Sequence, residues 1–209
     1  GREGKKISEM AEMKAAGAVA VTDDGGWVVD SGVARRVYEY ASTNGLPIMS
    51  HAEDPTISLN GVMNEGIVSS KLGLRGRPNA SEDIATARDI ELVRLIKCQL
   101  HFQHVSTRGA VDMIRRARAE GLPITAEATP HHIALTDEEF VKYDTFYKMN
   151  PPLRTEEDRQ AVLKGLEDGT IDVIATDHAP HAFEEKDLDI EVAPFGAIGL
   201  ESAFGVIMT

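Results

Sequence analysis

Hydrophobic positions along this chain alternate between a helical spacing and short unbroken apolar runs, with little linker between the two patterns. Apolar residues three or four positions apart predict helices, whereas short β-branched runs predict strands. The predicted helices cover residues 7–16, 33–42, 81–98, 108–120 and 155–166. The predicted strands cover residues 18–21, 46–49, 101–105, 123–127 and 171–176.

Repeated strand–helix alternation predicts a parallel sheet, because parallel neighbours need a long crossover connection. Polar clusters follow the predicted strands rather than precede them, which is typical of α/β folds and above all of (β/α)8 barrels. An open doubly wound sheet is the alternative, but it favours a glycine-rich phosphate loop, and the chain contains neither G-x-G-x-x-G nor a P-loop. We therefore predict an α/β fold of the TIM-barrel type.

Two regions carry additional local signals. Residues 55–78 are irregular and glycine-rich, and we interpret them as a functional loop. Ser81 is predicted to cap the helix over residues 81–98, and Thr136 with Glu139 fits a capping box for a further short helix.

The composition is that of an ordinary globular domain, with 42% hydrophobic and 27% charged residues. A net charge of −12 argues against nucleic acid or an anionic membrane surface as a partner. The single cysteine, Cys98, excludes an internal disulfide and favours a reducing, cytoplasmic compartment; its apolar surroundings predict a core residue. No apolar run is long enough to span a membrane.

The run over residues 171–176 ends in one carboxylate and two imidazoles, those of Asp177, His178 and His181. Pro180 prevents the strand from continuing. Titratable groups at the tip of an apolar strand are costly unless a metal, a substrate or a proton pairs with them. This cluster therefore predicts the rim of an active site.

Candidate metal ligands follow the C-terminal ends of four predicted strands: Asp24, His51, His104 and Asp177. Neutral imidazole and carboxylate oxygen are ordinary ligands of zinc. In a barrel, side chains that follow the C-terminal ends of the strands point toward one pocket on the barrel axis. Two ions bridged by one carboxylate, with a water between them, can make hydroxide near neutral pH, so the pattern predicts a metal-dependent site.

Each ligand also has a simpler interpretation. Asp24 could be a turn residue, and His51 could be a hydrogen-bonded core histidine. His101 and His104 lie three positions apart and face opposite sides of a strand, so at most one joins the site. Asp177 is the hardest to explain otherwise, because an unpaired carboxylate beside a buried strand is strongly disfavoured.

The same residues lie in blocks that resemble the dihydroorotases. The block Ala175-Thr176-Asp177-x-Ala179-Pro180-His181, with Lys186 five residues on, matches the signature of that family at each fixed position. Four further blocks occur in the order of the family: Thr22-Asp23-Asp24-Gly25, Ser50-His51-Ala52-Glu53, Gln103-His104-Val105-Ser106-Thr107 and Asn150-Pro151-Pro152-Leu153-Arg154. The chain is most similar to the bacterial type I dihydroorotases, in the amidohydrolase superfamily of metal-dependent (β/α)8 barrels.

The resemblance implies a two-zinc centre. Asp24 matches the carboxylate that bridges the ions, and His51 and His104 match the two ligands of the second ion. Asp177 matches the residue that binds the first ion and shuttles the proton as catalytic acid and base.

The resemblance also implies a substrate site and a reaction. Asn150 and His181 match positions that hold the substrate, and Phe195 with Gly196 matches a main-chain contact to it. The implied reaction is the reversible cyclisation of N-carbamoyl-L-aspartate to dihydroorotate in pyrimidine biosynthesis. A homodimer or a complex with aspartate transcarbamoylase is the implied assembly.

The chain departs from the family pattern in one respect. The first strand of the family carries His-x-His, and none of the seven histidines here forms that motif. The match covers roughly the fourth to eighth barrel strands. The chain also begins without methionine and ends inside an apolar run. We therefore expect residues 1–209 to be an internal part of one barrel domain, open at its edges and inactive alone.

Two other functions compete with this interpretation. Hydantoinases and allantoinases are related cyclic amidases, but they usually bridge their metals with a carboxylated lysine, where this chain has Asp24. A non-catalytic dihydroorotase-like scaffold for aspartate transcarbamoylase is the other. The retained ligand residues argue against such a scaffold.

Overall fold

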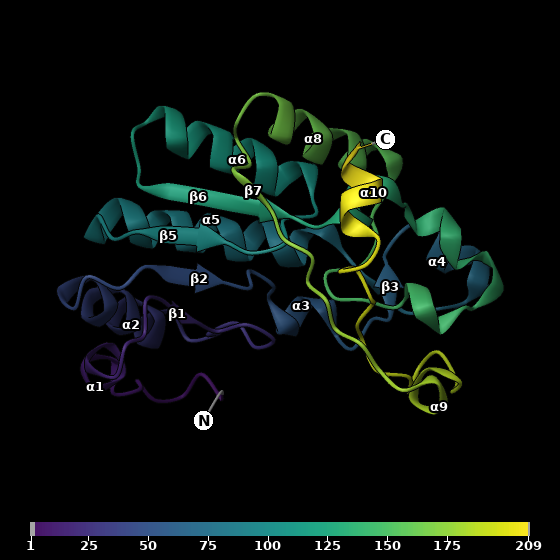
Figure 1. The fold of residues 1–209 in the computed structure, drawn as a ribbon, viewed down its shortest axis with the longest axis horizontal. Coiled ribbons are helices and arrows are strands. Elements are labelled where there is room, and N and C mark those ends of the chain that lie inside the picture. Colours follow the sequence, from purple (N-terminus) through teal and green to yellow (C-terminus); the bar gives the residue numbers. More distant parts are fainter. Residues whose placement is uncertain (1–2, 209) are drawn as a thin grey trace.

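A five-stranded parallel sheet organises the chain, and the computed structural model describes residues 3–208 of it (Figure 1). Its strands lie side by side in chain order: β1 (Val21–Thr22), β2 (Ile48–Ser50), β5 (Leu100–Phe102), β6 (Ile124–Ala128) and β7 (Val173–Ile174). Each is joined to the next through parallel pairing, as in Ile48 opposite Leu100 and Leu100 opposite Ile124. The predicted parallel α/β sheet is therefore confirmed, with β1 and β7 at its two edges.

The connecting helices form one layer along the sheet (Figure 1). Each of these helices precedes or links the strands: α1 (Met10–Ala15), α2 (Ser31–Thr43), α5 (Asn79–Ile96), α6 (Arg108–Ala119) and α8 (Glu156–Glu167). Neighbours α2 and α5, α5 and α6, and α6 and α8 pack together. Because crossovers between parallel strands are right-handed, strands laid down in order place all their helices on the same face.

The main core fills the space between this helix layer and the sheet. Ile48, Leu100 and Phe102 of the strands are buried against Val111 and Ile114 of α6. Cys98 is also buried, and burial raises the pKa of its thiol to about 11, so it remains a protonated core residue, as predicted.

Four of the five predicted strands are longer than the observed ones, and the first is an example. Only Val21 of the predicted strand over residues 18–21 lies in β1, and Val19 is 85% exposed. In the described chain β1 pairs with β2 only, and this pairing covers two positions, Val21 opposite Ile48 and Thr22 opposite Met49.

Two of the predicted caps are wrong. Helix α5 begins at Asn79, before Ser81, and Thr136 makes no side-chain cap to the 3-10 helix η1 (Asp137–Lys142). The structure instead uses threonine caps at Thr107 for α6 and Thr155 for α8, whose side chains accept hydrogen bonds from Ala110 N and Asp158 N.

The segment over residues 55–78 is a small folded unit rather than a loop. It contains α3 (Pro55–Ser58), β3 (Met63–Asn64), α4 (Ile67–Leu72) and β4 (Gly76–Arg77), and β3 pairs in parallel with β4. A Cβ at Gly76 would lie 2.4 Å from Glu65 Cα, so this close approach requires glycine. We call residues 55–78 the excursion.

A second core cluster joins the excursion to later segments. Val62 and Met63 pack with Phe140 of η1 and with Ile190. The remaining elements are α7 (Pro130–Ala134), η2 (Thr145–Tyr147), α9 (Phe183–Lys186) and α10 (Ala203–Met208). None of the helices in the described part of the chain is both long and apolar enough to cross a membrane.

Candidate functional site

Three predicted metal ligands converge beyond the C-terminal ends of neighbouring strands. Asp24 follows β1, His51 follows β2 and His104 follows β5. His51 Nδ1 lies 2.9 Å from His104 Nε2, and Asp24 Oδ1 lies 3.6 Å and 3.7 Å from these two nitrogens. We call Asp24, His51 and His104 the ligand triad; its donor atoms all lie within 4.8 Å of one another.

The ligand triad fits a divalent metal by its chemistry. Two imidazole nitrogens and one carboxylate oxygen are donors that zinc takes in hydrolytic sites. Both histidines are 4% exposed, whereas the Asp24 side chain is half exposed. A hydrogen bond with His104 lowers the pKa of Asp24 despite its partial burial, which keeps the carboxylate anionic.

Asp177 lies after β7 but outside the ligand triad. Partial burial raises the pKa of Asp177, the charge of His104 opposes that rise, and the charge of Asp24 adds to it. Asp177 therefore shares one electrostatic environment with the triad.

Asp177 and His104 both have left-handed backbone angles, φ 46° and 33°. Such angles are costly for non-glycine residues and are concentrated at functional sites.

His101 in β5 and His104 just after it have different contacts, and only one of them lies among the candidate ligands, as the sequence predicted. His104 belongs to the ligand triad, while His101 bonds to Thr125 Oγ1 at 2.8 Å and to Glu127 Oε2 at 2.9 Å. Glu127 Oε1 also accepts a hydrogen bond from the backbone N–H of His104 at 3.4 Å. His101 thus supports the strand through Glu127 rather than joining the triad.

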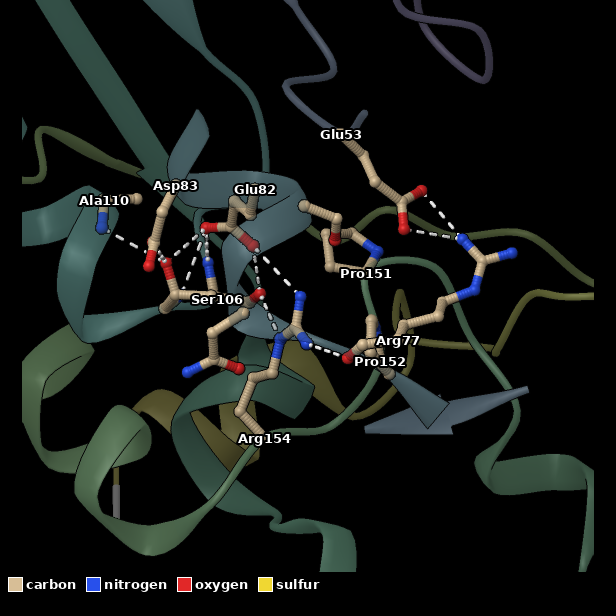
Figure 2. A network of polar contacts seen from close by, with 12 residues as sticks. Glu53, Arg77, Glu82, Asp83, Ser106, Ala110, Pro151, Pro152 and Arg154 are labelled. Atoms are coloured by element: carbon tan, nitrogen blue, oxygen red, sulfur yellow. Dashed lines mark hydrogen bonds and ion pairs between the residues drawn. The ribbon is translucent and has the colours of Figure 1, made fainter. Parts of the chain in front are cut away.

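One predicted substrate residue touches the ligand triad directly. Asn150 Nδ2 lies 3.1 Å from His51 Nε2, the ring nitrogen that faces away from the triad, and 2.9 Å from Glu53 Oε2. Arg77 Nη1 donates to both oxygens of Glu53 at 2.7 Å and to Asn150 Oδ1 at 2.9 Å. Figure 2 shows the pairing of Arg77 with Glu53.

The other predicted substrate residues form a second group. His181 Nε2 lies 2.9 Å from the carbonyl oxygen of Phe195, and Gly196 N donates to Lys148 O at 3.0 Å. Gly196 has φ 136°, and a Cβ there would lie 2.7 Å from Ala179 O. His181 and Gly196 line a cavity of about 370 Å³, together with His131, Tyr147 and Lys186 among others.

Two buried lysines hold the segment that carries this second group. Lys186 Nζ donates to the carbonyls of Thr145, Lys148 and Pro194 at 3.0, 3.2 and 2.9 Å. Lys148 Nζ donates to Ile190 O at 2.7 Å. Burial lowers the pKa of both lysines. The family signature position Lys186 therefore has a structural contact set here.

A buried network supports the exit of β5 (Figure 2). Glu82 Oε1 accepts from the backbone N–H groups of Ser106 and Thr107 at 2.9 and 3.1 Å. Arg154 Nη2 lies 3.6 Å from Glu82 Oε2, and Arg154 Nη1 donates to Arg77 O at 2.8 Å. This network joins the block that carries His104 to the block that carries Asn150.

Sequence reasoning missed Glu53 and Arg77 as parts of the site. Burial alone would raise the pKa of Glu53, but hydrogen bonding by His51 and the charge of Arg77 lower it to about 2. The available signal was the position of Glu53 two residues after a proposed ligand. Nothing in the sequence around Arg77 indicated a role in the site, because the irregular, glycine-rich pattern of residues 55–78 predicts a loop.

Comparison with known proteins identifies the family. A model of the "Dihydro-orotase-like" family matches residues 1–110, and the chain belongs to that family. The dihydroorotase of Pelotomaculum thermopropionicum is 52% identical over 209 residues, covering 100% of this chain and 49% of the relative. That of Carboxydothermus hydrogenoformans is 53% identical over 208 residues, covering 100% and 48%. The chain thus spans about half the length of these curated relatives.

Solved structures with a similar fold are named hydantoinases and dihydropyrimidinases. The L-hydantoinase (dihydropyrimidinase) of Arthrobacter aurescens has a TM-score of 0.83 and 26% identity, covering 96% of this chain and 48% of that one. The dihydropyrimidinase of Brevibacillus agri NCHU1002 has a TM-score of 0.80 at 22% identity, covering 95% and 46%. The second match supports the fold alone.

Proposed function

We propose that the complete protein carrying this chain is a dihydroorotase, which interconverts N-carbamoyl-L-aspartate and dihydroorotate in pyrimidine biosynthesis. The observation that carries the proposal is the identity of 52–53% with dihydroorotases along the whole chain. The converging ligand triad supports it, because hydrolysis of a cyclic amide needs an activated water and an acid for the leaving nitrogen.

The residues present fit a two-zinc centre in part. Asp24, His51 and His104 would hold one ion, and Asp24 with Asp177 would contribute to the other, whose remaining ligands would come from outside this chain. When bound, the zinc ions act as Lewis acids on the ring carbonyl and lower the pKa of water.

Asp177 is the proposed acid and base. In the hydrolytic direction its carboxylate takes a proton from the attacking water as the C–O bond forms. It then gives that proton to the ring nitrogen as the C–N bond breaks, and cyclisation runs the same steps in reverse. Its half-buried position beside His104 and Asp24 supports this role.

The second group and Asn150 are the proposed substrate contacts. His181 and Gly196 line one cavity, which has room for a ligand beside them. Asn150 and the main chain of Phe195 would complete the contact. The net charge of −12 does not attract a dianionic substrate, so local donors such as His181 must hold it.

The sheet edges support a place for this chain within a larger barrel. We propose that β1, β2, β5, β6 and β7 are the fourth to eighth strands of a TIM barrel. Additional strands would then pair with β1 and β7, and residues 1–209 alone would be inactive. A cytoplasmic location, and a homodimer or a complex with aspartate transcarbamoylase, complete the proposal.

A related cyclic amidase is the second candidate, because the hydantoinase structure superimposes with a TM-score of 0.83. The deciding experiment measures turnover of dihydroorotate, hydantoin and allantoin by the purified complete protein. We expect dihydroorotate to be preferred; preference for either other ring overturns the proposal. Absence of both bound zinc and turnover would favour the scaffold function.

A further inference from the structure

The guanidinium of Arg77 reaches out of the excursion and contacts Glu53 and Asn150, beside the ligand triad, and Phe195 of the second group. Arg77 is 9% exposed and lies at the end of β4. Its Nε donates to Gly61 O at 2.6 Å, which fixes the side chain to its own excursion. Its Nη1 then faces Glu53 and Asn150 beside the ligand triad.

Glu53 connects Arg77 to a ligand of the triad. The Nδ1 atom of His51 faces the triad, so its Nε2 atom faces away, 3.7 Å from Glu53 Oε2. In metal sites the ring nitrogen that does not bind the metal is commonly held by a carboxylate, which fixes the orientation of the ring. Glu53 is 8% exposed, and Arg77 neutralises its charge at that position.

Asn150 is oriented by the same guanidinium. Because Arg77 Nη1 can only donate hydrogen bonds, the acceptor atom Oδ1 of Asn150 points toward it. The Nδ2 atom of Asn150 then faces Glu53 Oε2, to which it donates at 2.9 Å.

Phe195 connects Arg77 to the second group. The carbon at the centre of the guanidinium lies 4.6 Å from the centre of the Phe195 ring, and Lys148 Nζ lies 4.6 Å from the same centre. Phe195 therefore contacts two cations through its ring, and its carbonyl oxygen lies next to His181 Nε2.

We propose that Arg77 is a positioning residue that sets the orientation of His51, through Glu53, and the placement of Asn150 and Phe195 for substrate. This inference rests on the proposed function for its substrate part, but not for its metal part. A lysine at position 77 would keep the charge, yet it cannot make the planar fork or stack in the same way.

The test compares Arg77→Lys with Arg75→Lys in the complete protein. Arg75 lies in the same excursion, is exposed in its hydrogen bond to Leu59 O, and touches neither group. For Arg77→Lys we expect a Zn²⁺ affinity about 10-fold weaker, measured by chelator competition, and a KM for dihydroorotate about 10-fold higher. For Arg75→Lys we expect both values to stay at those of the wild type.

Phe195→Leu separates the two connections. This substitution removes the ring that contacts Arg77 and Lys148, but it leaves the contact of Glu53 with His51 in place. We therefore expect a higher KM for dihydroorotate and an unchanged Zn²⁺ affinity. If Arg77→Lys lowers only the thermal midpoint, with KM and Zn²⁺ affinity equal to those of Arg75→Lys, the proposal is overturned. If Arg77→Lys does not fold, an unchanged KM in Phe195→Leu overturns it.

Failure of the proposed function gives a different result. A wild-type protein that binds Zn²⁺ but does not turn over dihydroorotate contradicts the dihydroorotase proposal. The Zn²⁺ affinities of the two arginine variants would still decide whether Arg77 acts on His51.

Discussion

The central strands and the edge strands of the sheet present their site residues in different environments. The central strands β2 and β5 are followed by His51 and His104, each 4% exposed and surrounded by buried networks. The edge strands β1 and β7 are followed by Asp24, whose side chain is half exposed, and Asp177, which is half-buried. The imidazole half of the site is therefore packed within this chain, whereas the carboxylate half lies at its margins.

The difference shows how one sheet can supply both rigid and accessible groups. A central strand has neighbours on both sides, so its exit is fixed by hydrogen bonds such as those from Ser106 N and Thr107 N to Glu82. An edge strand lacks one neighbour in the described chain, and its exit remains open to solvent or to further strands. Substitutions at the two kinds of exit should therefore separate stability from chemistry.

The largest effect is expected at the edge, from Asp177→Asn. Turnover by the complete protein should fall about 1,000-fold, because the amide cannot carry the proton. The fold should persist, since Asp177 is only half-buried. Steady-state kinetics and circular dichroism measure the two effects, and Asp187→Asn, at an exposed position of a neighbouring segment, is the control. A near-normal rate removes Asp177 from the acid and base role.

The next effect belongs to a central strand, from His104→Gln. Zn²⁺ affinity of the complete protein should fall about 100-fold or more, because a triad donor is lost. The matched control is His101→Gln, three positions earlier and bonded to Glu127 instead. Equal losses of Zn²⁺ affinity in the two variants would reject the assignment of His104 as a ligand.

A stability effect is expected where Glu82 supports the exit of β5. Glu82→Gln should lower the free energy of unfolding by about 3 kcal/mol, because Arg154 is left buried without its counter-charge. Glu167→Gln, which removes an exposed partner of Lys164, should cost less than about 0.5 kcal/mol. Urea unfolding measures the free energy of unfolding of both variants. A similar loss in Glu82→Gln and Glu167→Gln would contradict the idea that the buried ion pair matters more than the exposed one.

The smallest effect is a pH dependence from the exit of β6. Burial lowers the pKa of His132 well below its ordinary value and that of His131 to about 4. A folded-state pKa below the unfolded value contributes stability above about pH 6.5 that is lost as the pH falls toward the folded pKa. We expect each histidine to cost about 1 kcal/mol between about pH 6.5 and 5.5.

His132→Gln isolates that pH effect. His132 Nε2 lies 3.1 Å from Pro151 O, and a glutamine amide can donate to the same carbonyl without titrating. The thermal midpoint of this variant should depend less on pH over that range. An unchanged slope would show that another group controls the acid sensitivity.

The sequence predicted the order of the main elements and four candidate ligands, three of which lie together in the structure, and it failed where distant segments meet. The strand exits at His51 and His104 were visible because polar residues interrupt apolar runs. The excursion was not, because its core consists of Val62 and Met63 packed on Phe140 and Ile190, which lie far along the chain. The capping box at Thr136 also failed, because the N–H of Glu139 donates to the backbone carbonyl of Thr136 at 3.2 Å rather than to its side chain.

The sequence by itself therefore determined the periodic pattern, the parallel sheet and the side chains at the end of each strand, because those depend on local hydrophobic spacing. Only the tertiary structure decided which exits converge, that Asp177 stays outside the ligand triad, and that Arg77 joins Glu53, Asn150 and Phe195. Those contacts join residues 24 to 118 positions apart. Their geometry depends on how whole elements pack, which no local pattern encodes.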